Sequence, residues 1–219
     1  MAVRIYRSFC TQERYNPHFK PVRRASRVEP PSVGWEKQFR KAARIDPEPD
    51  DLMAIRESPP GVRHAPMPDF ISIYSVPVVS DAFRQLVLEL EQDKHQFLPI
   101  ALYDEAERLL PGRYWVMNIM QSRDAEIKPE RLKQWHAEGH RFPELSGFSR
   151  INEAGSLDLH SVIFLNKSLI EGLHLWRPTV IVSTHEMFLS DELMRRIRRA
   201  KLRELTVQPA VELSIGALQ

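Results

Sequence analysis

The chain has 219 residues, of which 42% are hydrophobic and 27% charged, proportions typical of a soluble globular protein and not of a fibrous, disordered or membrane class. Its formal net charge of +2 is small, and no segment approaches the ~20 apolar residues that span a bilayer. Because arginines interrupt the N-terminal stretch where a signal peptide needs an unbroken apolar run, we expect a cytoplasmic protein.

The N-terminal third is rich in proline. Ten of the seventeen prolines precede Asp69, a spacing that leaves room only for short helices and is expected to prevent central strands. Residues 1–8 have the pattern of a strand, and residues 34–44 form the best helix candidate, with Trp35 and Phe39 on one side. We expect residues 10–67 to form an extended arm or a meandering layer over the core.

A regular pattern begins at Asp69. Residues 70–74 alternate between apolar and polar, as a half-buried strand does. Ser80 can cap a helix and Asp81 favours the positive end of its dipole, and the apolar residues that follow fall on one face. We therefore predict a core helix over residues 80–91 and a strand over residues 96–100.

The C-terminal half continues with further strands and a second helix. Residues 114–120 are nearly continuously apolar, which indicates a central strand covered on both faces. Further predicted strands lie at residues 161–165, 173–176, 180–182 and 205–207. Ser190, Asp191 and Glu192 favour a helix over residues 190–200.

These elements predict an α+β fold, with a mixed or antiparallel sheet, a few amphipathic helices and a proline-rich N-terminal arm. We divide the chain into a proline-rich, basic arm or layer over residues 1–67 and an α+β domain over residues 68–219. Both predicted helices begin with Ser-Asp, at Ser80 and at Ser190. An internal duplication would explain this likeness, and so would the repeated use of a good helix start, which we favour.

The positive charge is concentrated in two places. Residues 1–46 hold eleven Lys and Arg against four Asp and Glu, and a second cluster consists of Arg195, Arg196, Arg198, Arg199, Lys201 and Arg203. Cations are favoured at the end of a helix, so the second cluster fits a solvated helix face, and a basic surface also attracts acidic partners. It has none of the interleaved aromatic residues that nucleic-acid binding would add.

The sequence contains none of the motifs that would indicate an enzyme. Cys10 is the only cysteine, which excludes an internal disulfide and a thiolate metal cage. The eight glycines form neither a G-x-G-x-x-G nor a G-x-x-x-x-G-K-[ST] loop, and no G-x-S-x-G or H-E-x-x-H motif is present. We therefore expect no catalytic residue, no cofactor and no metal.

His136 and His140 are the one pair of histidines with metal-ligand spacing. On a helix they would share one face, with Glu138 nearby, but a catalytic metal normally needs a third ligand, and Gly139 weakens the helix. We expect a surface loop or a frayed helix there, with a metal-dependent hydrolase as the alternative. Core histidines are expected at His160, His174 and His185.

Three blocks of sequence follow one another within residues 68–208. The first comprises residues 68–70, 77–84 and 95–100, the second residues 112–120 and 123–125, and the third residues 172–177 and 188–193. In order and spacing these blocks resemble the family known as immunity protein eleven, which is assigned to bacterial polymorphic toxin and contact-dependent competition systems. Ile5-Tyr6-Arg7 resembles the first strand of that family.

The resemblance implies a non-enzymatic antidote, a cytoplasmic protein that binds a cognate toxin or effector of a polymorphic toxin or type VI secretion system and blocks it directly. Because the chain is basic, we expect an acidic toxin face and no mimicry of nucleic acid. No membrane partner is expected. The expected partner-binding residues are Trp35, Phe39, Arg40, Arg195, Arg196, Arg198 and Arg199. The alternative is a nucleic-acid-binding or regulatory protein that uses the same basic helix and arm.

Overall fold

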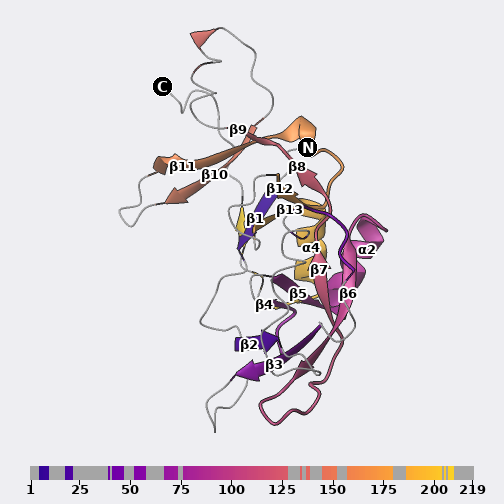
Figure 1. Ribbon diagram of the computed structural model, residues 1–219. Coiled ribbons are helices and arrows are strands. Elements are labelled where there is room, and N and C mark those ends of the chain that lie inside the picture. Colours follow the sequence, from indigo (N-terminus) through magenta and orange to yellow (C-terminus); the bar gives the residue numbers. More distant parts are fainter. Residues whose placement is uncertain are drawn as a thin grey trace.

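The structure is a computed structural model; within the residues that it describes lie the helices α2 and α4, packed against two large sheets, and a smaller third sheet (Figure 1). It describes residues 5–9, 18–21, 39, 41–46, 52–57, 67–73, 76–127, 134, 137–138, 145–151, 157–179, 186–203, 205 and 207–209. No helix within these ranges is long and apolar enough to cross a membrane.

The largest sheet has six strands in the order β2-β3-β6-β7-β5-β4. Their bounds are β2 His18–Pro21, β3 Met53–Glu57, β6 Gln96–Tyr103, β7 Tyr114–Asn118, β5 Val76–Ser80 and β4 Phe70–Ile73. β3 runs parallel to β6, whereas the other neighbours are antiparallel, so the sheet is mixed. The apolar strand β7 lies inside the sheet between β6 and β5, as its composition predicted.

A second sheet has five strands in the order β14-β1-β13-β12-β8. Their bounds are β14 Val207–Pro209, β1 Ile5–Phe9, β13 Glu186–Ser190, β12 Leu175–Pro178 and β8 Ser122–Arg123. The third sheet consists of β10 Leu145–Ile151, β11 Leu157–Asn166 and β9 Glu126–Ile127, and the short 3-10 helix η2 Lys167–Leu169 follows β11. The β10–β11 hairpin extends away from the helices (Figure 1).

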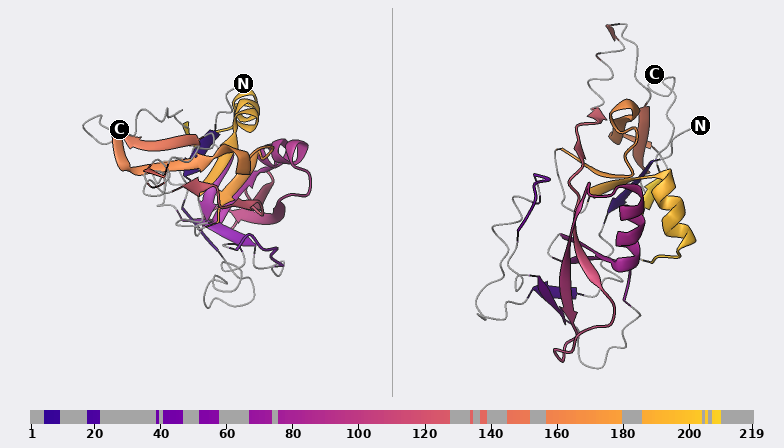
Figure 2. Two further views of the ribbon diagram at one scale, coloured as in Figure 1. Left: turned by 90° about the horizontal axis from the view of Figure 1, so that it is seen from above. Right: turned by 90° about the vertical axis from the view of Figure 1, so that its right-hand side faces the viewer.

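Helices α2 Asp81–Leu90 and α4 Asp191–Arg199 lie side by side (Figure 2). Each follows an antiparallel strand pair, β4–β5 before α2 and β12–β13 before α4. Their buried side chains share one apolar cluster with both large sheets; the helical members are Phe83, Val87, Leu193, Met194 and Ile197. The α+β fold class predicted from the sequence is therefore confirmed.

The other face of the six-stranded sheet carries a second apolar cluster. Side chains alternate along a strand, so Val79 and Met117 point toward α2 while their neighbours Val78 and Val116 point away. Phe39 and Ile45, from the segment before β3, pack on this second face. The buried amide of Gln96 fixes that segment, because its Oε1 accepts the N–H of Ile45 at 3.0 Å and its Nε2 donates to the carbonyl of the same residue.

Several sequence predictions need correction. The prolines do not exclude a central strand, since β3 lies between β2 and β6, and the stretch between Pro49 and Pro59 can bond on both edges because it contains no proline. The predicted helix over residues 34–44 is too long at its end: residue 39 is helical, but residues 41–42 form a turn and residues 43–46 have no regular structure. Residues 34–38 lie outside the described part of the chain.

Other strand bounds differ from the sequence patterns by a few residues. The strand predicted at 173–176 starts at Leu175, and the one predicted at 205–207 starts at Val207. Strand β6 continues past Pro99 to Tyr103; β3 pairs with it only from Ala101 onward, so within the described strands no partner needs an amide hydrogen at that proline. Residues 180–182 are not described.

Candidate protein-interaction site

The charged outer face of α4 is the surface on which the sequence placed most of the expected interface. Ser190 caps the helix, with its hydroxyl oxygen accepting the amide hydrogen of Leu193 at 3.2 Å. Asp191 and Glu192 occupy the first turn and arginines the last, an arrangement that matches the helix dipole. The apolar residues of α4 are buried, so its charged side chains must face outward.

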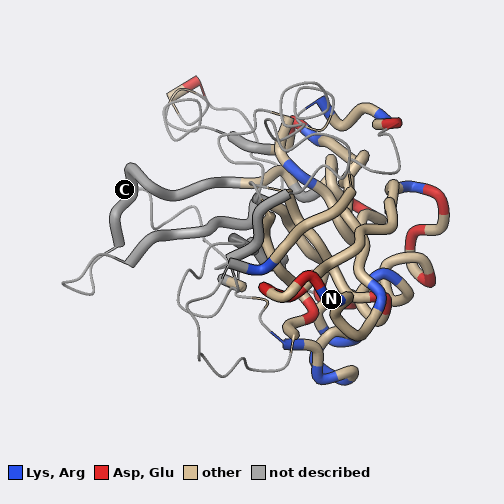
Figure 3. Tube along the Cα trace, turned by 60° about the horizontal axis from the view of Figure 1, so that its bottom comes forward, with Lys and Arg blue, Asp and Glu red and all other residues tan. Residues whose placement is uncertain are grey.

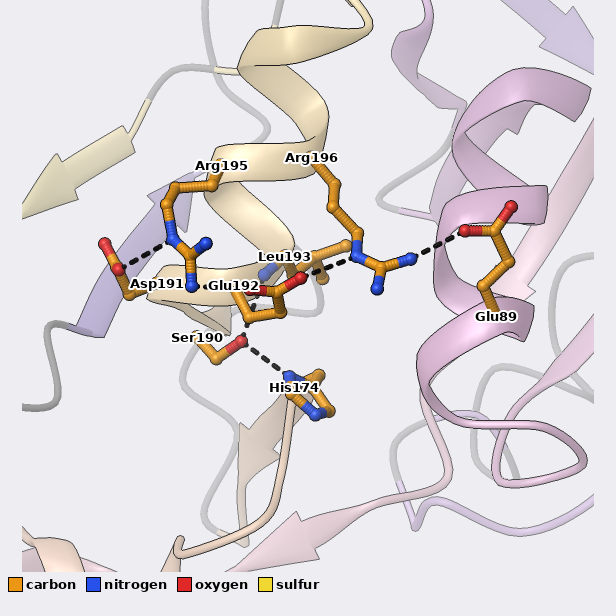
Figure 4. Close-up of polar contacts among 8 residues, drawn as sticks. All are labelled: Glu89, His174, Ser190, Asp191, Glu192, Leu193, Arg195 and Arg196. Carbon is orange, nitrogen blue, oxygen red and sulfur yellow. Dashed lines mark hydrogen bonds and ion pairs between the residues drawn. The ribbon is translucent and has the colours of Figure 1, made fainter.

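A chain of ion pairs crosses from α4 to α2 (Figure 4). Arg195 pairs with Asp191, Nε to Oδ2 at 3.1 Å, and with Glu192. Glu192 also accepts from Arg196, whose Nε lies 2.8 Å from its Oε1. The Nη1 of Arg196 then reaches Glu89 of α2 at 2.6 Å. These five residues form what we call the ion-pair ladder, which joins the two helices at the surface.

The pairing also fixes the charge states inside the ladder. The hydrogen bond from Arg196 lowers the pKa of Glu192 below its ordinary value. The same hydrogen bond raises the pKa of Arg196. Both groups are therefore charged at neutral pH, and each has used part of its hydrogen-bonding capacity within the protein.

Ser190 and His174 tie the start of α4 to the strand pair beneath it. The Nδ1 atom of His174 lies 2.8 Å from the hydroxyl oxygen of Ser190 (Figure 4). In addition, the backbone amide of Ser190 donates to the carbonyl of His174 at 2.9 Å. Because that hydroxyl already caps the helix, the pair holds α4 at a fixed angle to β12 and β13.

Glu91, the residue directly after α2, connects α2 to the strand pair β12–β13 that precedes α4. It is the second link between the two parts of the fold, after the ion-pair ladder. Its buried carboxylate accepts the amide hydrogens of His174 at 2.9 Å and Leu175 at 3.0 Å, and it lies 2.8 Å from Nε2 of His95. Burial alone would raise the pKa of Glu91, but the hydrogen bonds from His95 and from the His174 amide outweigh it, so the pKa is lowered. The ionised carboxylate therefore anchors the beginning of β12.

Between α2 and α4 lies a groove with a volume of about 530 Å³. Its lining residues are Leu86, Glu89, Glu192, Arg195, Arg196, Arg199 and Ala200. Four residues of the ion-pair ladder therefore line the groove, and Leu86, Ala200 and Arg199 complete the lining. A groove that combines apolar surface with fixed charges is suited to binding a protein side chain.

The four arginines that the sequence assigned to the interface are not equivalent. Arg195 and Arg196 belong to the ladder, and Arg198 is exposed and also takes part in an interaction. Arg199 is exposed and, within the described part of the chain, its side chain forms no hydrogen bond or ion pair. Among the described residues, Arg199 is therefore the arginine of the groove whose side chain has no partner.

The three arm residues are separated from this surface or are not described. Trp35 and Arg40 lie outside the described ranges. Phe39 is only 1% exposed and packs in the second apolar cluster, and its carbonyl accepts a hydrogen bond from Arg177, whose guanidinium lies 5.3 Å from the phenyl ring centre. A partner cannot reach Phe39 in this structure, so it is left out of the interface proposed below.

No group of three or more His, Cys, Asp or Glu side chains that could hold a metal ion occurs among the described residues. His136 and His140 lie outside them, as do Cys10 and His185. The expectation about the histidine pair stays a prediction.

The sequence analysis missed two sets of ion pairs in the site: those within α4 and the one between α4 and α2. The (i, i+4) spacing of Asp191 with Arg195 and of Glu192 with Arg196 could have shown that these arginines are paired along the helix. By contrast, the contact of Arg196 with Glu89 joins residues 107 positions apart, and no local pattern reports it.

Comparison with known proteins identifies the relatives of the chain. A family model described as Immunity protein family (Imm11) matches residues 21–212 of the 219 residues. The match begins well before residue 68, so it includes much of the proline-rich region that precedes the three blocks. No curated protein matches the chain. Since the family model covers most of its length, the chain belongs to the Imm11 immunity protein family.

Proposed function

We propose that this protein binds and neutralises a cognate bacterial toxin or effector by direct, non-catalytic inhibition. The observation that carries the proposal is the Imm11 match over residues 21–212. The proposal places the inhibition in the bacterial cytoplasm, against a toxin delivered by a polymorphic toxin or type VI secretion system.

The surface of α4 supports a protein as the partner. Basic and acidic residues are interspersed along the described chain (Figure 3), and the arginines of α4 alternate with carboxylates in the ion-pair ladder. Nucleic-acid binding depends on cations that are free to displace counterions from phosphates. Because Arg195 and Arg196 are already paired, α4 offers less to a polyanion than its sequence suggests.

The proposed interface consists of the outer face of α4 together with the arm residues Trp35 and Arg40. Tight binding to a protein usually depends on a few arginine and aromatic anchors surrounded by contacts of small effect. An acidic face on the toxin would be electrostatically complementary to these residues.

Co-expression tests the proposal. Each open reading frame adjacent to the gene is expressed in bacteria with and without this chain, and every pair in which growth is restored is then co-purified. We expect one toxic neighbour whose lethality this chain cancels, and a stable complex of the two proteins. Toxicity without rescue, or rescue without a complex, would contradict direct neutralisation.

A further inference from the structure

We propose that the groove between α2 and α4 receives an acidic side chain of the toxin, which pairs with Arg199 beside the apolar surface of Leu86 and Ala200. This inference rests on the proposed function and assigns the contact to one place on the molecule. The chemical class of the ligand is a single carboxylate, from Asp or Glu, carried by a folded protein.

The argument begins with the arginines that line the groove. Arg195 has two carboxylate partners on α4, and Arg196 joins Glu192 to Glu89 at distances of 2.8 and 2.6 Å. An incoming carboxylate would have to compete with these partners. Arg199 lines the same groove, is exposed and has no partner among the described residues, so a carboxylate can pair with it without breaking an existing bond.

The surroundings of Arg199 can strengthen such a pair. Leu86 is half-buried and Ala200 exposed, and both line the groove. A partner seated against them displaces water from around the guanidinium, and charges attract each other more strongly at lower effective dielectric. The arginine can also offer two parallel N–H donors to one carboxylate, a geometry that favours this group over a neutral acceptor.

The net charge of the lining limits the ligand to a small anion. Three arginines face two glutamates, so the lining residues carry 3 − 2 = +1. One carboxylate neutralises this charge. A nucleic-acid backbone presents many phosphates and would meet the fixed carboxylates of Glu89 and Glu192, which repel it.

The test compares two charge reversals on the full-length protein. Arg199→Glu places a negative charge in the groove, whereas Arg113→Glu makes the same change at an exposed arginine that does not line it. The probe is the toxin domain that co-purifies with the wild-type chain, and its Kd for each variant is measured by isothermal titration calorimetry. Urea unfolding of both variants checks that they fold, and Arg199→Gln is a second variant that removes the charge without reversing it.

We expect Arg199→Glu to weaken binding by about tenfold or more and Arg113→Glu to change it by less than about twofold. Equal binding of the wild type and both Arg199 variants would overturn the inference and leave the proposed function intact. If no toxin domain co-purifies with the wild type, both fail together. Salt-sensitive binding of a DNA or RNA oligonucleotide that depends on Arg199 would assign the groove to nucleic acid and would also overturn the inference.

A charge-swap experiment tests the pairing itself. Each acidic residue on the toxin surface is changed to arginine, and binding to wild-type and Arg199→Glu protein is compared. Recovery of affinity by one swapped pair, and not by the others, would identify the carboxylate in the groove. Absence of recovery at every acidic position would contradict a direct pair with Arg199.

Discussion

Helices α2 and α4 are built alike but present different surfaces. Each follows an antiparallel strand pair, begins after a serine and is capped by that serine's hydroxyl, which accepts the amide hydrogen three residues on at 3.3 Å in α2 and 3.2 Å in α4. Both bury apolar side chains in one shared cluster. Their outer faces differ, because α2 carries only three charged residues, Asp81, Arg84 and Glu89, whereas six of the nine residues of α4 are charged.

The comparison shows which positions determine the fold and which determine the surface. The cap and the buried stripe are enough to place a helix on the sheet, and both helices satisfy that requirement. The outer positions of α4 are not needed for this purpose, yet they hold six charged residues, the last of which, Arg199, has no side-chain partner among the described residues. The features common to the two helices therefore account for fold stability, and the charges that α4 alone has are consistent with the proposal that this helix binds the partner.

The largest expected effects come from the shared core. Phe83→Ala in α2 and Leu193→Ala in α4 should each lower the free energy of unfolding by about 3 kcal/mol or more, because both side chains are at most 1% exposed and each change leaves a cavity. Urea unfolding measures the effect, with Leu109→Ala, at a leucine that is 67% exposed, as the control. A small loss of stability for only one of these variants would show that the two helices do not contribute equally to the core.

The next largest effect on stability is expected at Glu91, which connects the end of α2 to the start of β12. Glu91→Gln should lower the free energy of unfolding by about 3 kcal/mol at pH 7, since the amide cannot accept all three hydrogen bonds that the buried carboxylate accepts. The matched control is Glu89→Gln, the same substitution at an exposed position of α2. Equal stability of the two variants would show that the buried carboxylate is not a significant connection.

The same variant gives a pH test with a defined sign. The folded protein lowers the pKa of Glu91 below its ordinary value of 4.5, so the stabilisation is fully present above that value and is lost as the pH falls through the lower folded pKa. The difference in unfolding free energy between wild type and Glu91→Gln should therefore shrink as the pH is lowered from 5 towards 3. A difference that stays constant over this range would contradict the lowered pKa.

A smaller effect should be common to the two caps. Ser80→Ala and Ser190→Ala should each cost about 1 kcal/mol, the usual contribution of an N-cap hydroxyl. Thermal or urea unfolding measures the loss. Ser122→Ala is the control, because among the described residues that exposed hydroxyl has a single, long contact of 3.4 Å, with Thr179. If one of the two cap variants were as stable as the Ser122→Ala control, the serine hydroxyl would not stabilise that helix, and the two caps would differ in energy despite their similar geometry.

The smallest effect on stability is expected at the ladder. Glu89→Gln removes the negative charge that pairs with Arg196; both side chains are partly exposed, and ion pairs of this kind add little to folding. The midpoint of urea unfolding should stay within experimental error of the wild type. A clear loss of stability would mean that the ladder holds the helices together, and that the charges of α4 serve the fold as well as the surface.

Much of this architecture could be predicted from local patterns. The starts of α2 and α4, their buried stripes and the interior position of β7 follow from capping residues and hydrophobic periodicity. The insertion of β3 between β2 and β6 could not be predicted, because it depends on pairing between residues far apart in sequence. The prolines around β3 also suggested an irregular layer where the structure contains a strand.

The site was predicted less completely, for a physical reason. Sequence located the arginines on one helix, but which of them is free depends on distant partners such as Glu89, 107 residues from Arg196. The burial of Phe39 likewise depends on sheet residues that are not its neighbours in sequence, since an aromatic residue in a proline-rich segment can be an anchor or part of a core.

The most direct test of the central claim is a titration of purified toxin with purified chain. The toxin's own activity is followed while the molar ratio is raised from well below one to well above one. Direct, non-catalytic neutralisation predicts that inhibition is complete near equimolar amounts and does not increase with longer incubation at lower ratios. Complete inactivation by a small fraction of an equivalent would show an enzyme, and undiminished toxin activity in excess chain would show that this protein is not its inhibitor.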